Sequence, residues 1–157
     1  MSFTSALTMQ QRSADETAAV LVNNAGIARD DNTKFSANGQ PDMTSAEAIS
    51  THFLRSEEQQ WMDTFHTNVT GQYFLSMAFL PLLAKAREST PGYTSQVVNV
   101  SSISGAMKGS SNGQFSYASS KAAFTHMSRM LATTFKDVKV RVNVSLISNC
   151  RCMRDWC

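Results

Sequence analysis

The hydrophobic pattern predicts strands that alternate with helices along most of the chain. A short apolar run, Ala18 to Val22, ends in Asn and Gly residues, which is typical of a strand buried on both faces. The run Gln96 to Val100 is rich in β-branched residues, and apolar residues alternate with polar ones from Val138 to Leu146. We therefore expect strands over residues 18–22, 96–100 and 138–146.

Helical patterns occupy the intervals between these strands. Thr44 and Glu47 have the spacing of a capping box, so a short helix is predicted to about residue 54, after a long polar loop over residues 27–43. The last helix is expected from residue 115 or 117 to 135. A longer helix is predicted over residues 56–88, where one apolar stripe has four-residue spacing: Trp61, Phe65, Val69, Tyr73, Met77 and Pro81.

This order of elements indicates the α/β class with a parallel sheet. Parallel strands need crossover connections, and helices between successive strands supply them with a right-handed turn. We expect the domain over residues 18–147, preceded by a loose segment over 1–17 and followed by an atypical tail over 148–157.

Composition and charge narrow the possible functions. A chain of 157 residues is of single-domain size, and its 14 Lys and Arg residues nearly balance its 12 Asp and Glu residues, which gives no sign of a nucleic-acid or membrane partner. The N-terminus lacks the pattern of a signal peptide, so we expect a soluble, cytoplasmic protein. No metal site is predicted, and three thiols near the end are expected to be reduced and without function: Cys150, Cys152 and Cys157.

The candidate chemistry lies between Ser101 and Lys121. Two hydroxyls end a strand, a polar loop with three glycines follows, and Tyr117 stands four residues before Lys121 at the start of a helix. This spacing puts both side chains on one helix face. An unperturbed tyrosine, with a pKa of about 10, is a poor acid or base near neutrality, but a positive charge roughly 5 Å away favours the phenolate by about 3 kcal/mol at an effective dielectric of about 20. The pair is a candidate for proton transfer, although a packed ring and a solvated amine fit the same spacing.

Four short motifs occur in a fixed order along the chain. They are Asn23-Asn24-Ala25-Gly26 after a strand, Asn68-Val69-Thr70-Gly71 in a helix, the serine strand Val98 to Gly105, and Tyr117-Ala118-Ser119-Ser120-Lys121. Together they resemble the short-chain dehydrogenase/reductase family, and Ile27-Ala28-Arg29-Asp30 is similar to its ketoacyl reductase-like members. The resemblance covers roughly residues 18–146 and implies a partial Rossmann-like, doubly wound parallel sheet.

The resemblance also implies an NAD(P)-dependent oxidoreductase that interconverts a carbonyl and an alcohol. Tyr117 would exchange a proton with the substrate oxygen, and Lys121 would favour the phenolate and bind the nicotinamide ribose. Ser102 would hydrogen-bond the carbonyl or alkoxide, and Asn68 would hold a water that links Lys121 to solvent. The cofactor, NADP or NAD, would contact Tyr117 and Lys121 together with three residues after the first strand: Asn24, Ala25 and Gly26.

The chain departs from the family pattern at both ends. Its first glycine is Gly26, so no TGxxxGxG loop, which would bind the cofactor pyrophosphate, precedes the first predicted strand. The Pro-Gly turn expected after Val144 is also missing. We therefore expect a truncated sheet without its first βαβ units and its C-terminal strand, with a hydrophobic edge at residues 18–22 and one face without covering helices. We hypothesise that such a chain keeps the acid–base residues and lacks a competent cofactor site.

Two functions from different classes remain open. The first is an oxidoreductase that acts on a small-molecule carbonyl or alcohol. The alternative is a catalytically inactive fragment that forms a dimer with a full-length relative, because in this family the helices that correspond to those containing Asn68 and Tyr117 commonly form the dimer interface. Homo- or hetero-oligomers through these helices are therefore expected. An activity that disappears in Tyr117→Phe would favour the first function.

Overall fold

A parallel sheet forms the framework of the molecule. The structure is a computed structural model that describes residues 17–89 and 92–148. Within this part of the chain, the sheet has the order β1 (Val20–Asn23), β2 (Gln96–Ser102) and β3 (Arg141–Ile147), and all pairs are parallel. The predicted α/β class with a partial parallel sheet is confirmed. The predicted segments 1–17 and 148–157 lie outside the described residues, apart from residues 17 and 148.

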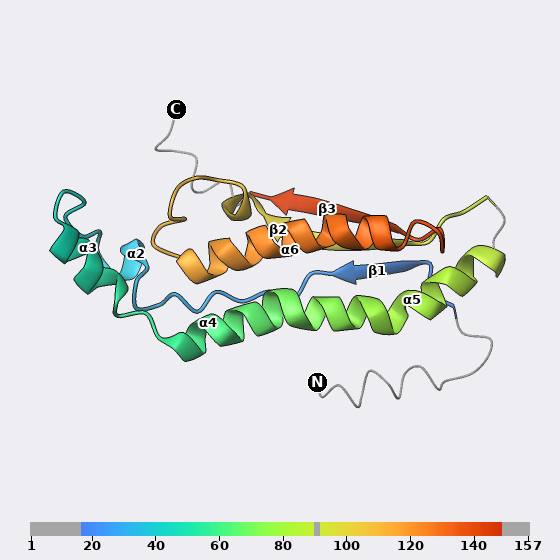
Figure 1. Ribbon diagram of the computed structural model, residues 1–157, viewed down its shortest axis with the longest axis horizontal. Coiled ribbons are helices and arrows are strands. Elements are labelled where there is room, and N and C mark those ends of the chain that lie inside the picture. The colour runs from blue at the N-terminus through green and yellow to red at the C-terminus, as the bar shows by residue number, and fades with distance from the viewer. Residues whose placement is uncertain (1–16, 90–91, 149–157) are drawn as a thin grey trace.

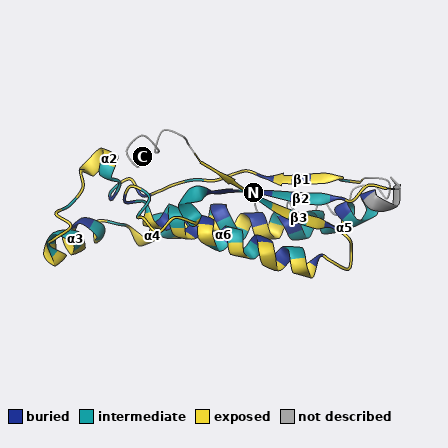
Figure 2. Ribbon diagram, turned by 90° about the horizontal axis from the view of Figure 1, so that it is seen from above, coloured by how far each residue is buried: buried dark blue, intermediate teal, exposed yellow. Residues whose placement is uncertain are grey.

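The long helices pack on one face of this sheet. The segments α4 (Glu58–Phe65), η1 (His66–Thr70) and α5 (Gly71–Ser89) follow one another without a break, and α6 (Phe115–Thr134) runs beside them (Figure 1). Figure 2 shows the strands above and these helices below, so the sheet and the helices form two layers. No helix in the described ranges is long and apolar enough to cross a membrane.

The apolar core lies between the two layers. Side chains of a strand alternate between faces, so every second strand residue meets the helices. Two of the core residues, Leu83 and Val97, have no exposed surface at all. The residues of the buried cluster come from both layers and from the turn before β3. They are Leu21, Leu83, Val97, Leu131, Phe135 and Val140.

The second face of the sheet is open, as expected for a truncated sheet, so the prediction from the apolar run that β1 is buried on both faces is wrong. Leu21 and Asn23 are buried against the helices, whereas Val20 and Val22 are 50% and 56% exposed. No described helix covers that second face (Figure 2). β1 also stands at the edge of the sheet, as expected. A short apolar run cannot by itself distinguish a strand covered on two faces from one covered on a single face.

Two short helices lie between β1 and α4. The predicted loop over residues 27–43 contains α2 (Phe35–Asn38), and α3 (Ala46–Phe53) follows it. Both project beyond the ends of α4 and α6 (Figure 1). The Oγ of Ser45 caps α3 by accepting the Ala48 N–H at 3.2 Å. The predicted cap, Thr44, is wrong by one residue, because its hydroxyl donates to Asp42 at 2.6 Å instead.

The buried face of the longest helical segment is polar over its first half. Its most buried side chains there are hydroxyls and amides at four-residue spacing: Thr64, Asn68, Gln72 and Ser76. The predicted apolar stripe is displaced to the flank, where Tyr73 and Pro81 are exposed and Met77 packs against the core. Both stripes have the same spacing, so periodicity could not choose between them. Hydrogen bonds to the ends of the strands decide the orientation.

A polar network joins the two layers. Asn23 Nδ2 donates to Ser76 Oγ at 2.9 Å and to Asn99 Oδ1 at 2.8 Å, and Asn99 Nδ2 donates to Ser128 Oγ at 2.8 Å. The network therefore connects β1, β2, α5 and α6. Polar groups buried in this way favour one packing arrangement, because any other would leave them unsatisfied.

The last helix and strand follow the prediction closely. α6 begins at Phe115 and ends one residue before the expected end. β3 begins at Arg141, three residues later than predicted, because the preceding residues form a turn. In this turn Lys139 has a positive φ of 59°, and its N–H donates to Lys136 O at 3.0 Å.

Candidate active site

Tyr117 and Lys121 lie together on the first turns of α6. The Lys121 Nζ is 5.9 Å from the centroid of the Tyr117 ring and 5.8 Å from that of Phe124. It donates a hydrogen bond to Val100 O, near the end of β2, at 3.1 Å. Tyr117 is half-buried, whereas Lys121 is only 5% exposed. The helix thus places an amine beside a phenol that remains accessible.

Burial changes the chemistry of this lysine. Removal from water penalises the charged amine, so burial lowers the pKa of Lys121 below its ordinary value of 10.5. The structure thus sets a buried amine over the face of a half-buried tyrosine ring, which is the pair that the sequence predicted.

Asn68 lies in an irregular turn between α4 and α5. Over η1 the helix is of the π type, in which the Gly71 N–H donates to His66 O. Asn68 Oδ1 accepts the Ile27 N–H at 2.8 Å, while Nδ2 donates to Ile27 O at 2.8 Å and to Ser120 Oγ at 2.9 Å. Both amide donors are therefore used, and a water at Asn68 would have to donate to one of its oxygens.

Ser102 is the last residue of β2 and is almost completely buried. Its Oγ accepts the Ser104 N–H at 3.2 Å, at the start of the 3₁₀ turn η2 (Ile103–Gly105). No hydrogen bond within the described ranges uses the Ser102 O–H as a donor. The preceding hydroxyl, Ser101 Oγ, donates to Lys121 O at 3.0 Å and so ties the end of β2 to α6.

The turn after β1 packs closely on Lys121. A Cβ on Gly26 would lie 3.1 Å from Lys121 Nζ and 3.4 Å from Asn68 Oδ1, so glycine permits this approach. Asn24, Ala25 and Gly26 are exposed. The resemblance assigns these three residues to the cofactor, and the last of them borders the buried amine of Lys121.

The sequence did not reveal three residues that hold this site together. Asp30 is 3% exposed, and its carboxylate accepts the backbone N–H groups of Ser116 and Tyr117 at 3.0 and 3.1 Å. Gln72 Nε2 donates to Ala25 O at 2.8 Å, and Ser120 Oγ accepts from Asn68. The repeat of polar residues at 68, 72 and 76 was the available signal for Gln72. Asp30 stood in the Ile27-Ala28-Arg29-Asp30 motif, but the motif gave it no role, because its partners lie more than 80 residues away.

Comparison with known proteins places the chain in a family. The sequence model described as short chain dehydrogenase matches residues 4–150. The short-chain dehydrogenase/reductase VdtF of Byssochlamys spectabilis is 33% identical over 143 residues, which cover 80% of this chain and 46% of VdtF. The 3-oxoacyl-[acyl-carrier-protein] reductase FabG of Pseudomonas aeruginosa is 30% identical over 124 residues, 79% of this chain and 39% of FabG.

Solved structures show the same fold. The NADP complex of RhlG from Pseudomonas aeruginosa superposes with a TM-score of 0.64 at 25% identity, covering 90% of this chain and 46% of RhlG. A carbonyl reductase from chicken fatty liver gives a TM-score of 0.62 at 23% identity, covering 88% of this chain and 49% of the reductase. The chain thus spans less than half the length of these relatives. It belongs to the short-chain dehydrogenase family.

Proposed function

We propose that this chain carries the acid–base half of an NAD(P)-dependent oxidoreductase that interconverts a carbonyl and an alcohol. The contact between the buried Lys121 amine and the half-buried Tyr117 ring supports this most strongly. Ser102 and the exposed turn of residues 24–26 stand at the carboxyl ends of β2 and β1, the edge at which parallel α/β sheets bind ligands. Family membership supports the same reaction class.

Each residue has a defined role in the proposed reaction. In reduction the Tyr117 O–H donates its proton to the substrate oxygen, and Ser102 hydrogen-bonds that oxygen while charge develops on it. Lys121 stabilises the phenolate that remains, and a water on an Asn68 oxygen returns the proton from solvent. The nicotinamide cofactor, when bound, supplies the hydride. Tyr117, Lys121 and the turn of residues 24–26 would hold its nicotinamide half.

The proposed substrate is a small ketone, with NADP or NAD as cofactor. FabG is named for reduction of 3-oxoacyl groups, and the RhlG structure holds NADP. A 3-oxoacyl thioester is therefore the first substrate to test. Comparison of the rate of ketone reduction with the rate of alcohol oxidation shows which direction the chain catalyses faster.

A cofactor titration and a turnover assay test this proposal. The proposed function requires that calorimetry detects micromolar binding of NADPH or NADH and that absorbance at the reduced-nicotinamide band reports thioester reduction, whereas the hypothesis of a missing cofactor site predicts neither. Tyr117→Phe should reduce turnover by about 10²-fold or more, because it removes the proton donor, while the exposed Tyr73→Phe serves as the matched control. A chain that binds neither cofactor and reduces no ketone would contradict the proposal.

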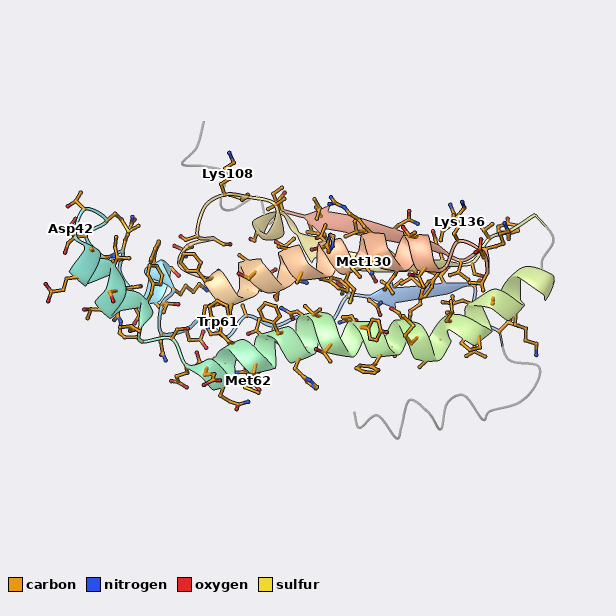
Figure 3. The ribbon with its side chains drawn as sticks, in the orientation of Figure 1. Asp42, Trp61, Met62, Lys108, Met130 and Lys136 are labelled. Carbon is orange, nitrogen blue, oxygen red and sulfur yellow. The ribbon has the colours of Figure 1, made fainter. Side chains whose placement is uncertain are left out.

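Association through the long helices is a second candidate function. Large apolar side chains are exposed on α4, α5 and α6, and Met62 lies on the side of α4 away from α6 (Figure 3). Exposed apolar side chains of this size are suited to a protein interface. They belong to Met62, Tyr73, Phe74 and Met130. We expect light scattering to show a dimer that Met62→Lys weakens and that the exposed-site control Lys108→Glu leaves intact. A monomer at all concentrations would exclude self-association, and a full-length relative that does not bind the chain would exclude the hetero-oligomer.

A further inference from the structure

The segment that follows β1 is tied to both helical elements of the candidate site. We call residues 25–33 the tether segment. The Ala25 carbonyl accepts from Gln72, both backbone groups of Ile27 pair with Asn68, and Thr33 Oγ1 donates to Gly113 O at 2.9 Å. Between these contacts, the carboxylate of Asp30 binds the start of α6. The tether segment therefore bridges the helix that carries Asn68 and the helix that carries Tyr117.

Asp30 caps α6 in place of a local residue. The first N–H groups of a helix have no partner within the helix. The N-cap residue of α6, Gln114, makes no side-chain hydrogen bond there, and the first turn contains no acidic residue. Asp30 supplies both the missing hydrogen-bond acceptor and the missing negative charge. Its two oxygens accept from Ser116 and Tyr117, and its charge is favourable at a helix N-terminus.

The turn before α6 is shaped to receive the tether segment. Gly113 has a positive φ of 82°, and a Cβ there would lie 2.3 Å from Thr33 O, so only glycine fits. The Phe35 N–H donates to Asn112 O at 2.9 Å. These contacts hold the segment that carries Asp30 against the turn before α6. They also fix the direction in which α6 starts.

We propose that Asp30 is a positioning residue for Tyr117. One of its oxygens binds the backbone N–H of Tyr117 itself and the other binds that of the preceding residue, so the carboxylate determines both the position and the rotation of the first turn. That turn sets where the phenol lies relative to Ser102 and Lys121. This inference rests on the proposed function, because the position of Tyr117 matters for turnover only if Tyr117 transfers a proton.

Turnover by Asp30 variants tests the proposal. Asp30→Ala removes both acceptors, whereas Asp30→Asn retains one oxygen acceptor without the charge. We expect kcat to fall by about tenfold to a hundredfold in Asp30→Ala, since small misplacements of reacting groups have effects of this order, with KM for the cofactor nearly unchanged. Asp30→Asn should recover part of the loss, and Asp31→Asn, at an exposed neighbouring acid, should behave like the native chain.

A loss of general stability must be distinguished from a loss of positioning. Ser45→Ala removes the cap of α3 and does not touch α6, so it is the matched control for a missing cap. Its kcat should stay within about twofold of the native value, because such a cap affects helix stability alone. An equal fall of kcat in Ser45→Ala and Asp30→Ala, or an unchanged kcat in Asp30→Ala, would overturn the proposal. If Asp30→Ala does not fold, Asp30→Asn takes its place in this comparison.

Two further measurements do not depend on turnover. Hydrogen exchange of the Ser116 and Tyr117 amides should be at least about tenfold faster in Asp30→Ala, with the amides in the middle of α6 unchanged. The ring resonance of Tyr117, observed in a Tyr73→Phe/Tyr93→Phe background, should also shift. If the native chain reduces no ketone, the proposed function fails and these two measurements still decide about Asp30. Unchanged exchange together with an unchanged ring resonance would reject its positioning role.

Discussion

Burial of Lys121 opposes the charge of its amine. The amine lies over two aromatic rings, donates to a backbone carbonyl and packs beside Gly26. Burial of an ammonium group costs folding free energy, and the interactions that the group makes offset only part of that cost. Titratable groups with such perturbed environments are frequent at catalytic sites. The unfavourable burial of Lys121 is therefore consistent with a role in the proposed proton transfer.

The lowered pKa of Lys121 predicts a rise in stability with pH. Below the pKa of the folded state both states are protonated, and the full burial penalty is present. As pH rises towards the unfolded value of 10.5, the folded chain releases its proton first, so the unfolded chain binds more protons and the free energy of unfolding increases. Urea unfolding at successive pH values above neutrality should show this increase in the native chain and not in Lys121→Met. An identical pH profile for both proteins would contradict the assignment, and Lys108→Met is the exposed control.

Local spacing and short motifs were sufficient to nominate the central residues of the candidate site. Tyr117 and Lys121 were found by their separation of one helical turn, and Asn68 and Ser102 by the motifs around them. Asp30 and Gln72 were not found, because each binds backbone atoms of residues 87 and 47 positions away, respectively. A backbone partner leaves no mark on the sequence, since every residue offers the same groups.

At the level of elements, η2 and α6 approach each other so closely that one residue type fits between them. A Cβ on Gly105 would lie 2.6 Å from Ala122 N and from Lys121 C, which are backbone atoms that cannot move aside. Gly105→Ala should therefore lower the free energy of unfolding by about 1–3 kcal/mol and reduce turnover through Lys121. In Gly109→Ala the new methyl group meets no atom within 4 Å, so the change should stay within about 0.5 kcal/mol.

Chemical denaturation of the two glycine variants distinguishes these outcomes. Equal midpoints for Gly105→Ala and Gly109→Ala would show that η2 does not contact α6 as described. A loss confined to Gly105→Ala would confirm the contact. The variants differ by the same methyl group and lie four residues apart, so the unfolded chain is affected similarly in both.

The π-helical turn is an element that the sequence did not predict. Hydrophobic periodicity indicated an uninterrupted helix over residues 56–88, whereas η1 separates α4 from α5. A π turn contains one residue more than an α turn and is rarely stable without outside contacts. Here the paired hydrogen bonds between Asn68 and Ile27 provide them. These contacts are tertiary, so no local pattern could reveal the turn.

At the scale of the whole molecule, the sheet divides the chain into a covered face and an open one. Adjacent residues of β1 should therefore respond very differently to substitution. Leu21→Ala removes a buried side chain and should cost about 2–5 kcal/mol, whereas Val22→Thr, at an exposed position, should change the free energy of unfolding by less than about 0.5 kcal/mol. Urea denaturation measures both values, and similar losses would show that the two faces are equally covered.

The contacts of the tether segment have a consequence for how this site can diversify. Gln72 and Asn68 bind it at the backbone carbonyl and amide groups of Ala25 and Ile27. Such groups are present whatever side chain a residue carries. Side chains at positions 25, 27, 28 and 29 can therefore be exchanged, and with them the shape and charge of the surface of this segment, while the same two helical side chains continue to hold the main chain. The residues that hold the segment in place are thus different from those that shape its surface.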